Sequence, residues 1–276
     1  MRRPLDRTAR LLAALLLPLA ALLAMLPAAP ASAADPAPSP TRFAAGNDWT
    51  CRPTAARPTP VVVVHGTFGD SASLLRRLRA SLVGNGYCAF SLDYGRRATA
   101  PIEGSAAELR DFVDRVLRET GAAKVSLVGH SQGGMMPRHY IRFLGGAAKV
   151  DDLVGLAPSN HGTRNPLLLT PGLSVLCPAC LQQATGSPFL QRLNAGDETP
   201  GAVSYTTVVT RLDQVVLPYT SGFLNGATNV TLQRKCPAHL PGHLRLPSDG
   251  AAIRVTLHAL ARRGPASPTY QPSCLP

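Results

Sequence analysis

The stretch that decides the fold is KVSLVGHSQGG, residues 124–134. Lys124–Val128 has the apolar and β-branched residues of a buried strand, and a helix is expected over Gln132–Leu144 directly afterwards. Between them lies a Gly-x-Ser-x-Gly pattern centred on Ser131. Its glycines leave room for a tight strand-to-helix turn that exposes the serine hydroxyl, and the amino end of the following helix favours negative charge there. The pattern predicts that Ser131 is a catalytic nucleophile.

Strands and helices alternate on both sides of this turn. Further strands are expected at Val61–Val64, Tyr87–Leu92, Val150–Leu156, Val203–Thr210 and Asn229–Leu232. Helices are expected at Ser71–Val83, Ser105–Glu119 and Asp249–Leu260. An apolar stripe with helical spacing runs along the second of these helices and consists of Leu109, Phe112, Val113, Val116 and Leu117. This alternation predicts one α/β domain, a mostly parallel sheet with helices on both faces.

A serine nucleophile needs a base to take its proton, and an acid orients that base. In this strand–turn–helix context the chain order is serine, acid, histidine. Asp213 follows the strand that ends at Thr210 and is the predicted acid. Asp197 is the rival, but it lies beside Gly196 in an irregular segment and has the setting of a turn residue.

The histidine base is expected in the loop before the last helix. His239 and His243 both lie there, and His243 is preferred because it is closer to the start of the helix. His258 falls inside the helix and is predicted to pack. His65 and His130 flank the glycine-rich loops and are predicted to be hydrogen-bonding struts rather than bases.

Two backbone N–H groups are needed to stabilise a tetrahedral oxyanion. One is predicted to be that of Gln132, the residue after the nucleophile. The other is expected from the loop after the first buried strand, VHGTFG at residues 64–69. Thr67 is the predicted donor in this loop, with Phe68 as the adjacent alternative.

The first 33 residues have the pattern of a secretory signal peptide. Four arginines precede an apolar run at Leu11–Leu26, and Ala31-Ser32-Ala33 follows. A membrane anchor is the alternative, but the run contains Pro18 and is shorter than the roughly 20 residues that span a bilayer. Residues 34–60 are rich in Pro and Ala and are expected to be an extended lead-in to a domain at 61–276.

Charge and cysteine content fit an exported chain. Loss of the first 33 residues, which hold four Arg and one Asp, would lower the net charge from +12 to about +9. This charge favours anionic surfaces such as lipid interfaces that carry fatty acid, and an arginine-rich composition with no specific partner is the alternative explanation. No nucleic acid partner is expected, because the basic residues are scattered and only 5% of residues are aromatic. Six cysteines suggest three disulfides, for which fifteen pairings are possible.

The pair Cys177 and Cys180 is close in sequence. It has the spacing of a redox motif or of half a zinc site, yet no second close pair completes a tetrahedral zinc site. A small local disulfide is therefore expected here, and no metal is predicted anywhere in the chain.

Taken together, six segments resemble the secreted bacterial class 2 triacylglycerol lipases and esterases of the actinobacterial type. The segments are VVVVHGTFGD, GYCAFSLDYG, VSLVGHSQGGMMPR, LVGLAPSNHGT, TRLDQVVLPYTSGFL and HLRLPSDGAAIRVTLHAL. The likeness runs from about Asp48 to Leu260 and implies the α/β-hydrolase fold. One departure is Pro241-Gly242 before His243, where a more polar lead-in is typical.

The resemblance implies a triad of Ser131, Asp213 and His243, with Thr67 and Gln132 as oxyanion donors. It also favours the disulfides Cys51–Cys88, Cys177–Cys180 and Cys236–Cys274. Residues 157–200 form an insertion rich in Pro, Gly and Leu, expected either to cap the site or simply to pack onto the sheet. The candidates for an acyl pocket are Phe68, Leu167, Leu168, Leu169, Leu173, Val175, Leu176 and Phe189.

The function implied by the resemblance is the hydrolysis of acylglycerols or simpler acyl esters through an acyl-enzyme. The scheme requires no metal or organic cofactor, and its partner is a lipid or other acyl-ester substrate at a lipid–water interface. The mature protein is expected to be a monomer and not an integral membrane protein. Acyl transfer, polyester cleavage and peptidase activity use the same triad. A lipid- or wall-binding protein without catalysis is the alternative from another class.

Overall fold

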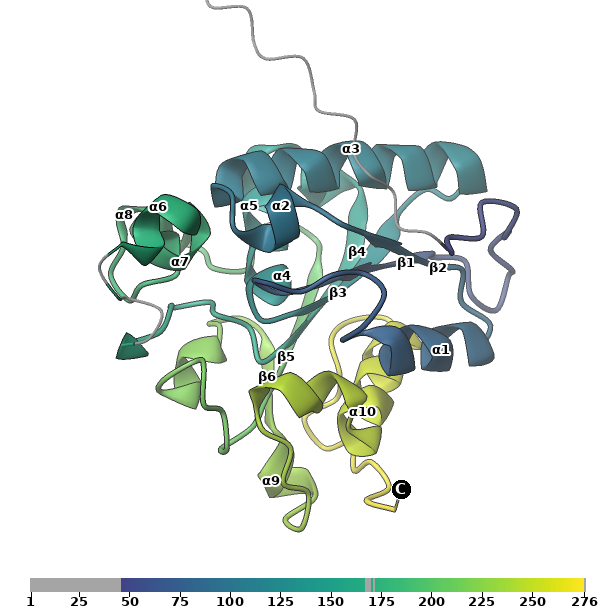
Figure 1. Ribbon diagram of the computed structural model, residues 1–276. Helices are drawn as coiled ribbons and strands as arrows, with labels where there is room; N and C mark the ends of the chain where they lie inside the picture. The colour runs from purple at the N-terminus through teal and green to yellow at the C-terminus, as the bar shows by residue number, and fades with distance from the viewer. Residues whose placement is uncertain (1–45, 167–169, 171, 276) are drawn as a thin grey trace, which may run out of the picture. The chain divides into compact units, whose positions relative to one another are not determined.

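The computed structural model describes residues 46–166, 170 and 172–275. The predicted signal peptide and the first part of the lead-in lie outside these residues. Six parallel strands form one sheet in the order β2-β1-β3-β4-β5-β6 (Figure 1). The strands are β1 (Val61–Val64), β2 (Ala89–Leu92), β3 (Val125–His130), β4 (Val150–Leu156), β5 (Ser204–Val209) and β6 (Thr228–Thr231). This is the predicted α/β architecture.

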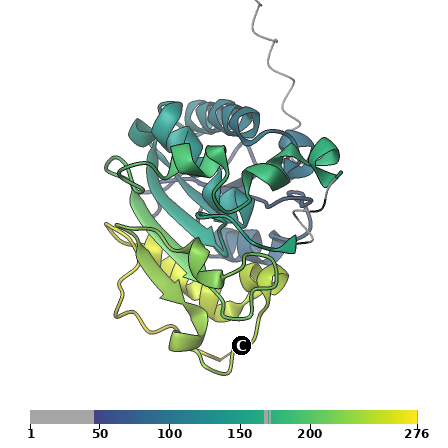
Figure 2. The same cartoon turned by 90° about the vertical axis from the view of Figure 1, so that its left-hand side faces the viewer.

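Helices cover both faces of the sheet (Figures 1 and 2). On one face lie α3 (Ile102–Thr120) and α5 (Pro137–Phe143), and on the other lie α1 (Arg76–Gly84) and α10 (Gly250–Leu260). The short helix α9 (Leu232–Lys235) follows β6. The sheet therefore has a separate apolar core on each side.

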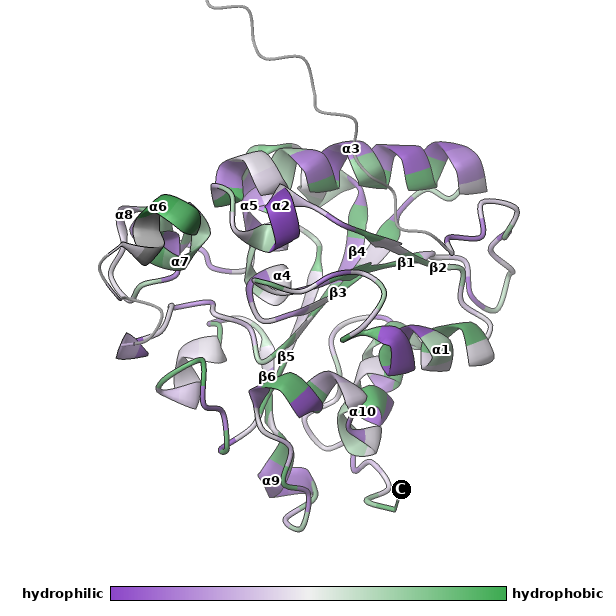
Figure 3. Ribbon diagram, in the orientation of Figure 1, coloured by the Kyte–Doolittle hydropathy of each residue, from purple (hydrophilic) through white to green (hydrophobic). Residues whose placement is uncertain are grey.

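Strand β1 shows that both faces of the sheet are buried. Its four valines are all at most 1% exposed, with Val62 and Val64 in one core and Val61 and Val63 in the other. Successive side chains of a strand point to opposite faces, so a continuous apolar run fits a strand that is covered on both sides. The predicted stripe of α3 packs on the first core, and Figure 3 shows this helix polar along its outer side.

The helix predicted over Gln132–Leu144 is interrupted after its first turn. Its first part, α4 (Gln132–Met135), is followed by Pro137, the first residue of α5. Proline has no N–H to continue the helical hydrogen bonds, although the intervening Met136 keeps helical dihedral angles. The predicted helix is therefore divided into α4, a single turn directly after Ser131, and α5.

The insertion at residues 157–200 contains three short helices among its described residues. They are α6 (Leu173–Leu176), α7 (Pro178–Gln182) and α8 (Pro188–Leu193). In Figure 1 they lie beside α2 (Gly95–Ala98). The N–H of Ala179 in α7 donates to the carbonyl of Thr99, which joins the insertion to the end of α2.

Disulfides and aromatic contacts hold the two ends of the described chain. Disulfides join Cys51 to Cys88, Cys177 to Cys180 and Cys236 to Cys274, the pairs that the family resemblance favours. The Trp49 ring lies 5.1 Å from that of Phe90, so the described part of the lead-in packs on the core. Within the described ranges, we find no helix with the length and apolarity that a bilayer span requires.

Candidate active site

Ser131 occupies a strained turn at the carboxyl end of β3. Its backbone angles are φ 57° and ψ −127°, and the residue is 6% exposed. Two glycines make the turn possible, because a Cβ on Gly129 would lie 1.8 Å from the carbonyl oxygen of Gly133. A Cβ on Gly133 would lie 2.3 Å from that of Val64. Only hydrogen atoms fit at these positions, and such strained backbone typically marks a functional site.

His243 and Asp213 come together at the same edge of the sheet. The Nδ1–H of His243 donates to Oδ2 of Asp213 over 2.8 Å, and both residues are nearly buried. The other carboxylate oxygen accepts the N–H groups of Val215 and Val216, each at 2.8 Å. These bonds orient the carboxylate, and the carboxylate fixes the tautomer that leaves Nε2 of His243 free to accept a proton.

His130, the residue before Ser131, links the nucleophile turn to the histidine loop. Its Nε2–H donates to the carbonyl of His243 at 3.0 Å, and the two rings lie 4.6 Å apart. Burial lowers the pKa of His130 well below its ordinary value, and the neighbouring His243 lowers it further. His130 is therefore a neutral strut. Within the described chain, no hydrogen bond joins Ser131 Oγ to Nε2 of His243; such bonds often tighten only when substrate is bound.

Of the two predicted oxyanion donors in the loop after β1, Thr67 and Phe68, one has a free N–H among the described residues. The N–H of Phe68 donates to the carbonyl of Arg97 at 2.8 Å, so it is already occupied. The N–H of Thr67 has no acceptor among the described residues. The hydroxyl of Thr67 lies 3.2 Å from Oε1 of Gln132, the other predicted donor residue. The geometry favours Thr67 over Phe68.

Comparison with known proteins places the chain among lipases. The model of the family "Lipase (class 2)" matches residues 58–253, well over half of the chain. The chain belongs to the class 2 lipase family. As a class 2 lipase, it is 32% identical over 123 residues to a triacylglycerol lipase of Burkholderia plantarii. That match covers 42% of this chain and 33% of the relative.

Other relatives extend the comparison. A triacylglycerol lipase of Pseudarthrobacter phenanthrenivorans is 32% identical over 91 residues, 31% of this chain and 28% of that protein. This class 2 lipase thus matches about a third of the length of its curated relatives. Its fold resembles that of Aspergillus fumigatus lipase B, with a TM-score of 0.68 and 21% identity over 82% of this chain and 57% of the other. For the mature lipase BlEst2 of Bacillus licheniformis the TM-score is 0.60, with 18% identity over 78% and 96%.

The other acid and histidine candidates have different partners in this class 2 lipase. Asp197 is exposed and accepts the N–H of Thr199 in a turn. His258 stacks on Tyr270 with the ring centroids 3.8 Å apart, so it packs as predicted.

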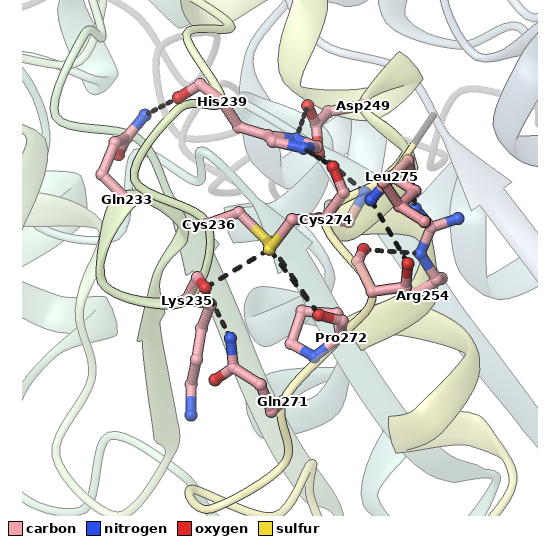
Figure 4. The surroundings of a disulfide bond; sticks show 12 residues. Gln233, Lys235, Cys236, His239, Asp249, Arg254, Gln271, Pro272, Cys274 and Leu275 are labelled. Carbon is pink, nitrogen blue, oxygen red and sulfur yellow. Dashed lines mark hydrogen bonds and ion pairs between the residues drawn. A yellow bond between two sulfur atoms is a disulfide. The ribbon is translucent and has the colours of Figure 1, made fainter.

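His239, the rival of His243, belongs to a separate pair. Its Nδ1 lies 2.7 Å from Oδ2 of Asp249 and its Nε2 lies 2.8 Å from the carbonyl of Cys274 (Figure 4). Both ring nitrogens face acceptors, and these hydrogen bonds raise the pKa of His239. His239 therefore fastens the C-terminal segment beside the Cys236–Cys274 disulfide.

The unusual Pro241-Gly242 lead-in is explained by a close contact. A Cβ on Gly242 would lie 2.4 Å from Oε1 of Gln214, the oxygen that accepts the N–H of His243 at 3.1 Å. The carbonyl of Pro241 accepts the hydroxyl of Thr210 at 2.7 Å. The two residues thus tie the histidine loop to the acid loop.

The predicted pocket residues with described side chains differ in their surroundings. Phe68 is 47% exposed beside the predicted oxyanion donor. Phe189 is buried in the core, so it follows the packing alternative, whereas Val175 and Leu176 are 82% and 75% exposed.

The remaining pocket candidates lie outside the described part of the structure. They are Leu167, Leu168 and Leu169, together with the side chain of Leu173. The acyl-pocket role of Leu167 and Leu168 therefore stays a prediction from the sequence.

Two features near the site were not predicted. The first is α2, whose four residues all have positive φ, between 50° and 62°. The carbonyl of Arg97 in this turn accepts the N–H of Phe68. Such a left-handed turn costs about 1–2 kcal/mol for each non-glycine residue. The second feature is Gln183, whose side chain contacts Thr67. No local pattern signals either, because both act through contacts with distant parts of the chain.

His65, the other predicted strut, lies under the oxyanion loop. It is fully buried, its Nδ1–H donates to the carbonyl of Gly66 at 2.8 Å, and its ring stacks on Tyr94. Burial lowers the pKa of His65.

Among the described residues, no group of three or more His, Cys, Asp or Glu side chains is placed to hold a metal ion.

Proposed function

We propose that this protein is a secreted triacylglycerol lipase or esterase that acts through a Ser131–His243–Asp213 triad. The observation that carries the proposal is the 2.8 Å His243–Asp213 bond at the sheet edge where β3 ends in the strained Ser131 turn. Membership of the class 2 lipase family supports ester hydrolysis as the reaction. The curated relatives that it matches are named triacylglycerol lipases.

In the proposed reaction Ser131 Oγ attacks the ester carbonyl while His243 Nε2 takes its proton. Asp213 keeps the imidazole oriented and stabilises the imidazolium. The N–H groups of Thr67 and Gln132 hold the oxyanion of the tetrahedral intermediate. His243 then protonates the leaving alcohol, and a water molecule, activated by the same histidine, releases the acid from the acyl-enzyme.

A lipid surface is the substrate environment that the exposed side chains support. Of the eleven exposed large apolar residues in the described chain, eight lie in the loop after β1, in the insertion after β4, between β5 and β6 or between β6 and α10, and each of these segments begins at the carboxyl end of a strand. They are Phe68, Val175, Leu176, Leu181, Leu212, Leu217, Leu240 and Leu244. In a parallel sheet these ends share one edge, the edge of Ser131. Apolar side chains gathered around a catalytic edge favour contact with an acylglycerol surface over a small soluble ester.

Export is the second part of the proposal. The signal-peptide pattern of the first 33 residues and the three disulfides both fit an oxidising, extracellular compartment. Mass spectrometry of protein recovered from a culture medium tests it. We expect an N-terminus near Ala34, and recovery of the intact N-terminus only inside the cells would contradict export.

The activity is tested with purified protein and p-nitrophenyl esters of short, medium and long acyl chains. Ser131→Ala should lower the rate by at least about 10⁴-fold, because the nucleophile is lost. Ser267→Ala, a serine in the C-terminal segment, is the matched control and should keep the wild-type rate. Equal inertness of wild type and Ser131→Ala on every chain length would exclude the esterase and favour a non-catalytic lipid-binding protein.

The same material separates hydrolysis from acyl transfer. An organophosphonate that carries an alkyl chain should label Ser131 and no other serine, as mapped by mass spectrometry of the digested protein. Adding a long-chain alcohol to the ester assay should leave the free acid as the main product. If the alcohol ester dominates, the protein is an acyltransferase on the same triad.

A further inference from the structure

We propose that Gln183 is a positioning residue that holds the oxyanion loop through the hydroxyl of Thr67. The inference rests on the proposed function and adds a part of the insertion to the catalytic support. The Nε2 group of Gln183 donates to Thr67 Oγ over 2.9 Å, between residues 116 positions apart in the chain. Gln183 is 5% exposed, so water competes little for this bond.

The amide of Gln183 has a defined orientation. Its Nε2 also lies 3.2 Å from the carbonyl oxygen of Ala179, which can only accept a hydrogen bond. The Oε1 atom accepts the hydroxyl of Ser159 at 2.9 Å, and Ser159 is 1% exposed. Both N–H groups of this amide therefore have an acceptor, and a flipped amide would turn its oxygen toward the carbonyl oxygen of Ala179 instead.

This orientation also sets the role of the Thr67 hydroxyl. Because Gln183 donates to Thr67 Oγ, the hydroxyl must give its own proton elsewhere, and it donates to Oε1 of Gln132 at 3.2 Å. Ser159, Gln183, Thr67 and Gln132 thus form one chain of side-chain hydrogen bonds. The chain joins the insertion to both residues whose N–H groups are the proposed oxyanion donors.

The Cys177–Cys180 disulfide stabilises the helix that directly precedes Gln183. Gln183 is the C-cap residue directly after α7, and its N–H donates to the carbonyl of Ala179. Cys177 and Cys180 close a disulfide across the first turn of this helix, and both are nearly fully buried. A helix this short has little stability of its own, so the cross-link and the Thr99 contact keep its end in place. The insertion thereby acts as a support for the oxyanion loop.

The test is a double-mutant cycle with Gln183→Met and Thr67→Val, assayed on a p-nitrophenyl ester. Met keeps the length of Gln but has no N–H to donate to the hydroxyl of Thr67. We expect each single variant to lower kcat about tenfold, less than the 10²–10³-fold typical for loss of a whole oxyanion donor, with KM within about twofold. The double variant should be no worse than the poorer single variant, because both remove the same bond.

Gln182→Met is the matched control. Gln182 is the neighbour in α7 and also links the insertion to the domain, through the N–H of Ile102 and the carboxylate of Glu103, but it does not touch Thr67. Its kcat should stay near the wild-type value. Equal losses in Gln182→Met and Gln183→Met with equally lowered Tm, or multiplied losses in the double variant, would overturn the proposal.

Two further measurements keep the result unambiguous. If Gln183→Met does not fold, Thr67→Ser and Thr67→Val test the same bond from its other end. The serine variant retains the hydroxyl, so the kcat of the valine variant should lie about tenfold below that of the serine variant, and equal rates for both overturn the proposal. Failure of the proposed function itself is recognised separately, because wild-type protein would then neither hydrolyse the ester nor react with the organophosphonate at Ser131.

Discussion

Oδ2 of Asp213 lies 2.8 Å from Nδ1 of His243, although thirty positions separate the two residues in the chain. The bond connects the loop after β5 to the loop after β6, and both partners are nearly buried. We expect Asp213→Asn to lower kcat by about 10³–10⁴-fold, because an amide can favour the wrong histidine tautomer. Steady-state kinetics on a p-nitrophenyl ester measures the effect.

Asp197→Asn is the control for this substitution. Its carboxylate is exposed and caps a local turn, so kcat should remain within about twofold of wild type. A comparable loss in both variants would mean that Asp197 takes part in the reaction and that the proposed triad is wrong.

The nucleophile turn should not accept a side chain at Gly133. A Cβ there would lie 2.3 Å from the carbonyl oxygens of both Val64 and His65, and backbone atoms cannot move aside cheaply. We expect Gly133→Ala to lose about 3 kcal/mol or more of unfolding free energy in a urea titration. Gly104→Ala, in the exposed part of α3 with open space around it, should instead gain about 0.5–1 kcal/mol. Equal stability of the two variants would contradict the packing described for the turn.

Stability should depend on pH through Asp152. This residue of β4 is 4% exposed, its carboxylate has only Ser126 as a hydrogen-bond partner in the described structure, and burial raises its pKa to about 7. A carboxyl whose folded-state pKa lies above its unfolded value binds its proton more tightly when folded. Its contribution is therefore largest at low pH and falls as the pH rises from about 4 to about 7.

Asp152→Asn removes this dependence. The Tm of the variant should exceed that of wild type at pH 8, on the order of 5 °C, and the difference should vanish near pH 4. The control is Asp151→Asn, because the side chain of Asp151 is half-exposed. A Tm difference for Asp152→Asn that does not change with pH would contradict the raised pKa. Differential scanning fluorimetry across this range makes the comparison.

The opposite dependence is expected at His239. The hydrogen bonds to the carbonyl of Cys274 and to Asp249 raise the pKa of this histidine. Its contribution to stability is therefore complete below its unfolded-state pKa and is lost as the pH rises through the folded-state value. His239→Gln should therefore lower Tm more at pH 5 than at pH 9. His258→Gln serves as the control, since burial lowers the pKa of His258 and its substitution should cost no more at pH 5 than at pH 9. Parallel pH profiles for the two variants would rule out the pairing in Figure 4.

Local pattern was enough to predict most of the scaffold. The four valines of β1, the stripe of α3 and the glycines around Ser131 each follow from residue type and spacing, because strand burial and tight turns depend on a few adjacent residues. Chain order then predicted Asp213 and His243. The interruption at Pro137 was missed although proline is itself a local signal.

Ser131 as a nucleophile and the order of its partners could thus be inferred from the sequence by itself. Only the tertiary structure shows which of two nearby groups contacts which partner. His243 faces Asp213, whereas His239 faces Asp249. The N–H of Thr67 is free, whereas the N–H of Phe68 donates to the carbonyl of Arg97. Gln183 reaches Thr67 from a segment 116 positions away. The physical reason is the same in each case: a hydrogen bond depends on distance and direction in space, and neither is encoded in the spacing of residues that meet only when the chain folds.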